Sequence, residues 1–484
     1  MKRFLKKFPL VVLAFSFLVS CARSSWMPHW FEQEHAVEYR EVPTRRYIDT
    51  ITSVTKEQAL ADLDFFKYLI ETSYAGYEYQ QEKLGVNFEK NFDHAQAYIQ
   101  KLDSETLSYN EFKEIISIAL SGVQDGHFSF MLPGLGPYQH KTFYYSGITV
   151  SRKNGKYLVE ASSVDGVSPG DRYRGPKEHL FRIYSDDGNR YRIGTLSRTP
   201  VNTLSLKFKK EMVEVPVAPD MILPGPEVPV YSLTDDVAYL RIPSFIALGE
   251  SGTVSPEGRK QLEEVIRHIR MLDKGNTVII DLRNNPGGYT DTSALVPAIL
   301  FKRQASNFMP EMAELFSPGT TQARLQNIWD KGDNSDGYRN LRKAAQLEAD
   351  KQKKNPVRRW ERQSYRVAAS KPIENKRKII IIINRCSASA SEILCAIRTI
   401  PNVTIIGENS AGILSFDAGQ LYVLPNSQVP VLLPDAIVID TSFSAGEGIG
   451  VLPDYWVLKD ELEDVLRAMT GRSSFTIPVT NSPR

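Results

Sequence analysis

The first clear pattern along the chain is helical and begins shortly after residue 50. Leu60, Leu63 and Phe66 recur at helical spacing, and Thr55 followed by Gln58 is typical of a capping box at a helix N-terminus. A second apolar face with the same spacing precedes a glycine and comprises Phe112, Ile115, Ile116, Ala119 and Val123. These patterns predict a helical N-terminal domain over residues 50–130.

After residue 130 the pattern changes to short β-rich runs separated by turn dipeptides. Asn154-Gly155 and Asp187-Gly188 are typical of hairpin turns, so we predict a β-rich domain over residues 131–232. Residues 166–171 (GVSPGD) resemble a turn of the PDZ domains found in exported proteases. A PDZ-like fold is therefore one expectation for this domain.

Residues 233–470 show α/β patterning. Apolar, β-rich segments at 237–245 and 277–282 flank an amphipathic helix. Five consecutive isoleucines at 379–383 lack alternation, as expected for a central strand that is buried on both faces. Residues 303–370 are polar, highly charged and helix-prone, and we predict that they form an insertion within this domain. Residues 471–484 are expected to be a tail.

The first 21 residues have the anatomy of a secretory signal. Four cations precede an apolar run at residues 8–19 that is too short to span a bilayer comfortably. The run ends in Leu-Val-Ser-Cys21, which resembles the lipobox of bacterial lipoproteins. The resemblance implies a lipoprotein signal peptide over residues 1–21 and lipid attachment at Cys21, and we read residues 22–49 as a tether. The protein would then be exported and anchored to a membrane, facing the periplasm or the cell surface. An ordinary cleavable signal is the alternative.

Charge and cysteine content exclude several classes of partner. The 59 basic and 57 acidic residues leave a formal charge of +2, so a polyanion such as nucleic acid is not an expected partner. Beyond Cys21 only Cys386 and Cys395 remain, too few for a disulfide framework or a thiolate metal site. The sequence also contains no His-Glu-x-x-His, Cys-x-x-Cys or P-loop motif, so neither a metal nor another cofactor is expected.

Candidate chemistry gathers where the isoleucine strand ends. Residues 384–392 (NRCSASASE) contain Ser387, Ser389 and Ser391 in a predicted strand-to-helix turn. Such a turn can expose a serine hydroxyl while the unpaired N–H groups of the first helical turn face a developing negative charge. The alternative is that these serines only cap the helix, which is a common role of serine.

Two further segments bear on the choice between a nucleophilic serine and a capping serine. Residues 278–288 (VIIDLRNNPGG) end a strand in paired glycines, and residues 407–412 (GENSAG) follow the serine turn. Together with the Ala-Ser-Ala-x-Glu sequence at 388–392, they resemble the S41 family of serine peptidases over roughly residues 50–460. The resemblance implies a ClpP/crotonase-like α/β catalytic domain, Ser389 as the nucleophile, and an oxyanion hole formed by the N–H groups of Gly288 and Ala390.

The same resemblance leads to a histidine base. The processing-protease branch of the family uses a lysine at the position that Ile413 occupies, and an aliphatic side chain cannot accept a proton. The tricorn-like branch instead carries a histidine, which His127 matches, and a glutamate, which Glu447 matches. That branch places a relay serine before the histidine, where this chain has Gly126. Glu447 would therefore act directly or through water, or Asp125 would replace it.

The expected activity is that of a serine endopeptidase, which hydrolyses polypeptides through an acyl-enzyme on Ser389. Ile413 and Gly126 motivate one alternative, a catalytically inactive relative that binds peptides or apolar ligands. Shared architecture alone motivates another, a crotonase-type acyl enzyme. Nothing in the pattern selects an oligomeric state.

Overall fold

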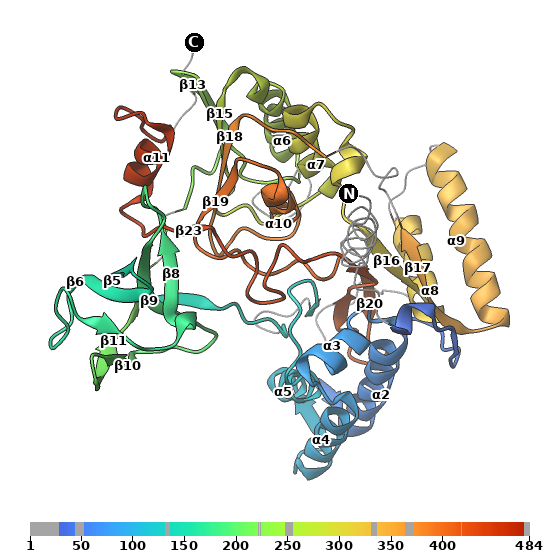
Figure 1. Cartoon of the computed structure of the whole chain (residues 1–484). Coiled ribbons are helices and arrows are strands. Elements are labelled where there is room, and N and C mark those ends of the chain that lie inside the picture. The colour runs from blue at the N-terminus through green and yellow to red at the C-terminus, as the bar shows by residue number, and fades with distance from the viewer. Residues whose placement is uncertain are drawn as a thin grey trace, which may run out of the picture.

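The computed structural model describes residues 29–43, 53–130, 136–220, 222, 224–246, 255–330, 336–363, 372–417 and 419–478 (Figure 1). Residues 1–28 lie outside this range, so the expected signal peptide and Cys21 do too. In the described part of the chain, no helix is both long and apolar enough to span a bilayer.

A six-stranded sheet organises the second half of the chain. Its order is β13 (Val230–Thr234), β14 (Val237–Arg241), β15 (Thr277–Asp281), β18 (Lys378–Ile383), β19 (Val403–Gly407) and β23 (Tyr455–Trp456). β13 is antiparallel to β14, and every later pair is parallel. Because β13 already belongs to this sheet, the chain enters it three residues before the expected boundary at 233.

The isoleucine run is the centre of this sheet, as predicted. Alternate side chains of a strand face opposite sides, and both sides of β18 are covered. Ile379, Ile381 and Ile383 pack with α6 (Pro256–Ile269), α7 (Thr290–Phe301) and α10 (Ala390–Leu394). Ile380 and Ile382 pack instead in the cluster that contains α11 (Leu462–Thr470). The α/β fold with helical and β-rich domains is therefore confirmed.

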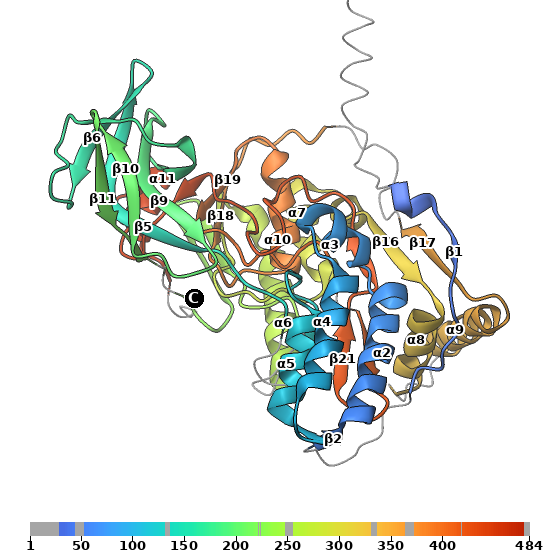
Figure 2. The same cartoon turned by 90° about the horizontal axis from the view of Figure 1, so that it is seen from below.

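Residues 142–219 form a sheet that projects from the rest of the molecule (Figures 1 and 2). Its order is β11 (Glu211–Pro216), β10 (Thr203–Phe208), β7 (Arg172–Tyr173), β6 (Lys156–Ser162), β5 (Thr142–Lys153), β9 (Arg190–Ser197) and β8 (Leu180–Ile183), with β12 (Ala218–Pro219) on β5. Phe143 and Phe181 pack against Trp456 of β23 and attach this sheet to the other.

The PDZ-like expectation finds no support in this sheet. A PDZ peptide groove is bounded by a strand and a helix, and residues 142–219 contain only strands and one short 3-10 turn, η2 (Lys177–His179).

The N-terminal helices do not form a core of their own. They are α2 (Lys56–Ser73), α3 (Tyr77–Leu84), α4 (Phe88–Lys101) and α5 (Tyr109–Ala119), and α2 begins with the expected capping box of Thr55 and Gln58. Their apolar faces share one cluster with β4 (Ser129–Phe130) and with a C-terminal hairpin, β20 (Gln420–Val423) and β21 (Pro430–Leu433). Figure 2 shows β21 beside α2, α4 and α5.

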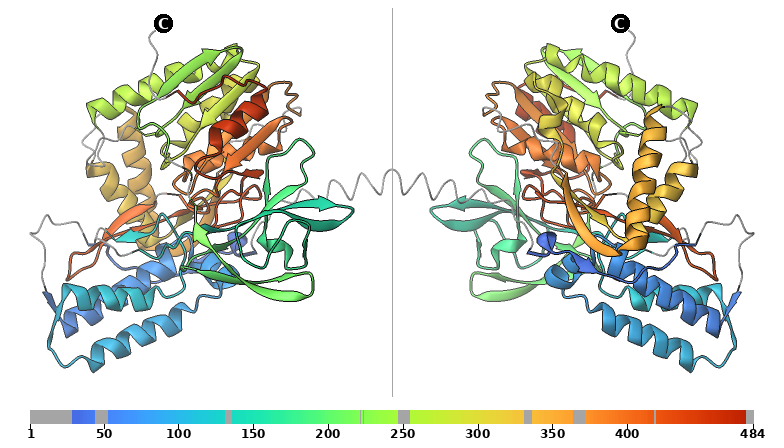
Figure 3. Two further views of the ribbon diagram at one scale, coloured as in Figure 1. Left: turned by 90° about the vertical axis from the view of Figure 1, so that its left-hand side faces the viewer. Right: turned by 90° about the vertical axis from the view of Figure 1, so that its right-hand side faces the viewer.

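The segment predicted as an insertion joins a third sheet. It contains β16 (Met312–Phe316), α8 (Pro318–Asp330), α9 (Asp336–Lys354) and β17 (Val357–Gln363). The strand order is β1 (His35–Ala36), β17, β16 and β22 (Ala436–Val438), so this segment is hydrogen-bonded to strands from the N-terminal and the C-terminal parts of the chain. α9 lies at the periphery of the molecule (Figures 1 and 3).

Asp62 on α2 provides a test of the link between the helices and the C-terminal hairpin. Its buried carboxylate accepts the N–H groups of Asn426 at 2.8 Å and Ser427 at 2.7 Å. We expect Asp62→Ala to lower the free energy of unfolding by about 2–3 kcal/mol, because it leaves these donors without an acceptor. Denaturant unfolding measures this loss. The matched control is Asp64→Ala, which removes a surface ion pair with Arg40 and should cost less than about 1 kcal/mol. Equal losses in the two variants would contradict the prediction.

Candidate active site

The turn after β18 separates the three candidate serines by their surroundings. The Ser387 hydroxyl donates to Leu282 O at 2.8 Å, and the Ser391 hydroxyl donates to Ala388 O at 2.7 Å; both residues are fully buried. Ser389 is only partly buried and lines a small cavity. The hydroxyls of Ser387 and Ser391 therefore hold the turn together, whereas Ser389 can meet a ligand.

Ser389 also has an unusual backbone conformation. It immediately precedes α10 and has φ 50° and ψ −118°, a region that a residue with a side chain rarely adopts. A sharp strand-to-helix turn of this kind raises the side chain of a nucleophilic serine above the helix N-terminus. Ser389 is also the N-cap of α10 and forms a capping box with Glu392, but a capping serine normally has an extended backbone, so the cap alone does not require this strained conformation.

The glycine turn after β15 lies directly against this serine. A Cβ atom on Gly287 would lie 2.6 Å from Ser389 Cβ and 3.0 Å from Ala390 N, so only glycine fits there. Gly288 forms a bridge with Phe245, in which the flanking residues supply the hydrogen bonds. Within the described residues, the N–H groups of Gly288 and Ala390 donate to no acceptor. Both predicted oxyanion donors are therefore available.

Asn285 holds the glycine turn to the serine turn, a role that the sequence analysis missed. Its Oδ1 accepts Gly287 N–H at 2.8 Å, and its Nδ2 donates to Ile242 O at 3.0 Å. Its own carbonyl accepts Ala388 N–H at 2.9 Å. The signal was present, since an asparagine two residues before a glycine is typical of an Asx-turn.

Glu392 connects the serine turn to the following loop. One carboxylate oxygen accepts the N–H groups of Ser389 and Ile413, and the other accepts Gly412 N–H and the Ser410 hydroxyl. Burial raises the pKa of Glu392 to about 7, although these donors favour its charged form. The glutamate of the Ala-Ser-Ala-x-Glu sequence thus positions the loop rather than facing the cavity.

The histidine segment reaches the same loop from the N-terminal half of the chain. Asp125 accepts the N–H groups of His127 and Phe128 and the hydroxyl of Tyr74, at 2.8, 3.1 and 2.8 Å. Nδ1 of the partly buried His127 is shielded from solvent and has no hydrogen-bond partner in the described part of the chain. Burial lowers the pKa of His127 to about 4, so the imidazole is neutral at neutral pH.

Glu447 approaches the backbone of this segment and not the imidazole. Its Oε1 accepts Gly126 N–H at 3.0 Å, and its Oε2 accepts the N–H groups of Leu414 and Ser415. Burial and the nearby charge of Glu447 raise the pKa of Asp125, and burial also raises that of Glu447. Glu447 therefore fixes the main chain next to His127, while Asp125 faces Tyr74 instead of the ring.

Ile413 joins the two halves of the candidate site. Its carbonyl accepts Ser389 N–H at 3.1 Å, and its side chain covers Gly126, where an added Cβ would lie 2.4 Å from Ile413 Cγ1. The segments around residues 127, 389, 413 and 447 are thus in contact despite their separation along the chain. Among the described contacts, the His127 ring and the Ser389 hydroxyl do not hydrogen-bond with each other.

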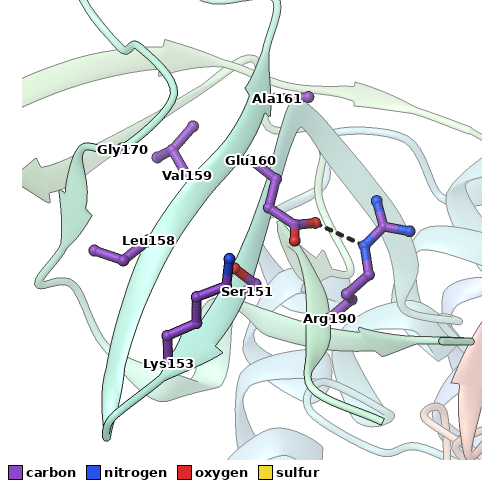
Figure 4. Close-up of a pocket in the computed structure, with 8 residues that line it drawn as sticks. All are labelled: Ser151, Lys153, Leu158, Val159, Glu160, Ala161, Gly170 and Arg190. Atoms are coloured by element: carbon purple, nitrogen blue, oxygen red, sulfur yellow. Dashed lines mark hydrogen bonds and ion pairs between the residues drawn. The ribbon is translucent and has the colours of Figure 1, made fainter. Parts of the chain in front are cut away.

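A wider hollow of about 670 Å³ lies on the β-rich sheet and contains none of the predicted site residues (Figure 4). It opens broadly to solvent, and the ion pair between Glu160 and Arg190 lies across it at 2.6 Å. Its lining includes Ser151 but no histidine or carboxylate other than Glu160. The candidate site is therefore the smaller cavity at Ser389. The described residues also contain no group of three or more His, Cys, Asp or Glu placed to hold a metal ion.

Comparison with known proteins agrees with the motifs in this region. The sequence profile of peptidase family S41 matches residues 236–457, which include Gly288, Ser389 and Glu447 but not His127. Residues 236–457 are an S41 peptidase domain. The resemblance predicted from the three motif segments is thereby confirmed. Because S41 is a family of serine peptidases, residues 236–457 belong to a serine peptidase family.

Several solved structures are similar to this chain. Mature CPAF is 15% identical, with 86% of this chain and 95% of that chain covered and a TM-score of 0.44. A lipoprotein from Streptococcus agalactiae is 14% identical, with 88% and 99% covered and a TM-score of 0.39. The photosystem II D1 C-terminal processing protease is 14% identical, with 86% and 97% covered and a TM-score of 0.33. No curated protein sequence matches the chain.

Gly126 and Ile413 offer a test of the contact between the two halves of the site. We expect Gly126→Ser to lower the free energy of unfolding by about 1–3 kcal/mol, because its Cβ would overlap Ile413. Ile413→Ala should remove this overlap, so the double variant should be more stable than the two single losses imply. A double-mutant cycle by denaturant unfolding measures the coupling. Gly136→Ser is the matched control, since the nearest atom to its Cβ lies 3.9 Å away. Additive effects at 126 and 413 would contradict the contact.

Proposed function

We propose that the protein is a serine endopeptidase, with Ser389 as its nucleophile. The observation on which this proposal rests is the strained Ser389 backbone packed against the glycine turn, together with the N–H groups of Gly288 and Ala390, which donate to no acceptor within the described residues. Such donors stabilise the oxyanion of a tetrahedral intermediate, and loss of one typically costs about 3 kcal/mol of transition-state stabilisation.

In the proposed reaction, Ser389 Oγ attacks the carbonyl carbon of a peptide bond while Nε2 of His127 accepts its proton. The carbonyl oxygen becomes negative and is held by Gly288 N–H and Ala390 N–H. The histidine then returns the proton to the leaving amine, and the C–N bond breaks to give an acyl-enzyme. Water, activated by the same histidine, releases the acid and restores Ser389.

The imidazole of His127 is neutral and can therefore accept the first proton. Burial keeps it unprotonated at neutral pH, and Ile413 has no group that could serve instead. Glu447 would act as a positioning residue, since its hydrogen bond to Gly126 N–H restrains the main chain adjacent to the base. Glu447 would therefore act on the base through the main chain and not by direct contact with the imidazole.

The protein would act on its polypeptide substrate outside the cytoplasm. The proposal includes a lipid anchor at Cys21, on the strength of the basic and apolar N-terminal segment and its Leu-Val-Ser-Cys ending. A tether of about 28 residues would then place the domains near a membrane surface.

A second candidate function is binding without catalysis. One observation favours it: the His127 ring and the Ser389 hydroxyl form no hydrogen bond within the described residues. Catalytic hydrogen bonds are often long in a free enzyme and tighten only with substrate, so the peptidase remains the proposed function.

Labelling with a fluorophosphonate probe tests the nucleophile. We expect the wild-type protein to be labelled covalently and Ser389→Ala to lose labelling without loss of its far-UV circular dichroism. Ser473→Ala, at an exposed serine outside the site, is the matched control and should be labelled like the wild type. Equal labelling of the Ser389→Ala variant would remove this residue from the proposed role.

The pH dependence of labelling tests the base. His127 stays unprotonated above its pKa of about 4, so the rate constant should fall on the acid side near pH 4 and not near 6.5. His127→Gln should slow labelling roughly a hundred- to ten-thousand-fold and abolish this acid limb. Stopped assays across pH 3.5–8, with circular dichroism to exclude unfolding, measure both effects. An acid limb that persists in His127→Gln would show that another group is the base.

A further inference from the structure

The cavity at Ser389 has an apolar wall assembled from distant parts of the chain. Besides Ser389 itself, its lining contains six apolar side chains: Met312, Ile393, Ile413, Leu414, Phe416 and Val438. The remaining two lining residues are Thr290 and Asp417. A cavity next to a nucleophilic serine can receive a side chain of a bound substrate.

These apolar residues come from three different parts of the fold. Ile393 lies four residues after Ser389 and so sits on the same side of α10, one turn further along. Leu414 and Phe416 come from the loop that Glu447 and Glu392 anchor. Two lining residues come from the third sheet, in which Met312 of β16 and Val438 of β22 are cross-strand partners. The segment predicted as an insertion thus contributes directly to the site.

Charge in the lining is confined to the exposed Asp417. Its backbone N–H donates to Ala436 O, while Phe416, its neighbour, is fully buried. A charged side chain that entered the cavity would lose hydration and meet mainly hydrocarbon, which is strongly unfavourable. An aliphatic side chain would gain free energy in proportion to the apolar area it buries.

We propose that this cavity is the subsite for the P1 residue, on the acyl side of the cleaved bond, and that it selects an aliphatic side chain. The inference rests on the proposed function and specifies its substrate. The cavity has a volume of about 10 Å³, so an entering side chain must displace part of its wall. Met312 suits this movement, because its unbranched thioether has more conformational freedom than the branched residues around it.

A series of fluorogenic peptides that differ only at P1 tests the proposal. We expect kcat/KM for Val or Leu at P1 to exceed that for Lys or Glu by roughly a hundred-fold or more. A preference for Lys would overturn the proposal, because it would mean that Asp417 and not the apolar wall selects the residue. Equal rates for all P1 residues would overturn it as well.

Substitution of Met312 locates the preference in this cavity. Met312→Glu should lower kcat/KM for Leu at P1 by at least ten-fold and raise that for Lys. Met212→Glu is the matched control, because Met212 is 60% exposed on β11 of the β-rich sheet and should leave the ratio unchanged. Val438→Thr, which keeps the side-chain shape, provides a second variant should Met312→Glu unfold, and it should lower kcat/KM for Leu more than for Lys. An unchanged Leu-to-Lys ratio in these variants would place the subsite elsewhere.

Fluorophosphonate labelling separates failure of this inference from failure of the proposed function. Labelling at Ser389 together with a flat or Lys-directed P1 profile would overturn the subsite and leave the peptidase intact. Absence of labelling in the folded wild-type protein would overturn the peptidase, and the subsite with it.

Discussion

The arrangement of the whole site depends on one buried carboxylate, that of Glu392. It lies in the first turn of α10 and accepts hydrogen bonds from Ser389, Ser410, Gly412 and Ile413. A carboxylate in a dry interior is stable only when donors surround it, and these donors come from the serine turn and from the loop after β19. The hydroxyl of Ser410 also accepts Val451 N–H at 2.6 Å. The constraint therefore extends to the segment next to Glu447.

The hydrogen bonds to Glu392 also determine where the N-terminal half of the chain packs. The loop held by Glu392 presents the Ile413 carbonyl to Ser389 and the Ile413 side chain to Gly126. Glu447 then bridges Gly126 to Leu414 and Ser415. The helices that precede His127 are secured independently, because they share a core with β20 and β21. Two separate contacts thus fix the histidine segment against the S41 domain.

The two departures from the family motifs also have one physical explanation. An isoleucine at position 413 and a glycine at position 126 are complementary, since the isoleucine side chain fills the space that any side chain at 126 would need. With no side chain there, Glu447 bonds to the main chain instead of to a hydroxyl. The pair accordingly places an apolar contact where the family motifs have two polar groups.

The sequence by itself determined the local elements and the S41 motifs. Helical spacing of apolar residues identified α2 and α5, and a capping box marked the start of α2. A run of isoleucines without alternation identified the buried strand β18. These signals depend on residues close together in the chain. The ordered motifs at 278–288, 388–392 and 407–412 identified the family, and the serine turn was visible in its small residues.

Only the tertiary structure decided which distant groups meet. Three contacts join segments that are far apart in sequence. Asn285 holds the glycine turn to the serine turn, Ile413 packs over Gly126, and Met312 and Val438 together line the cavity. The structure likewise showed that the helical region shares a core with a C-terminal hairpin. It also showed that the strands of the segment at 303–370 pair with β1 and β22. Hydrophobic periodicity specifies which face of an element is buried, but not the partner that buries it, and that is the physical reason for the division.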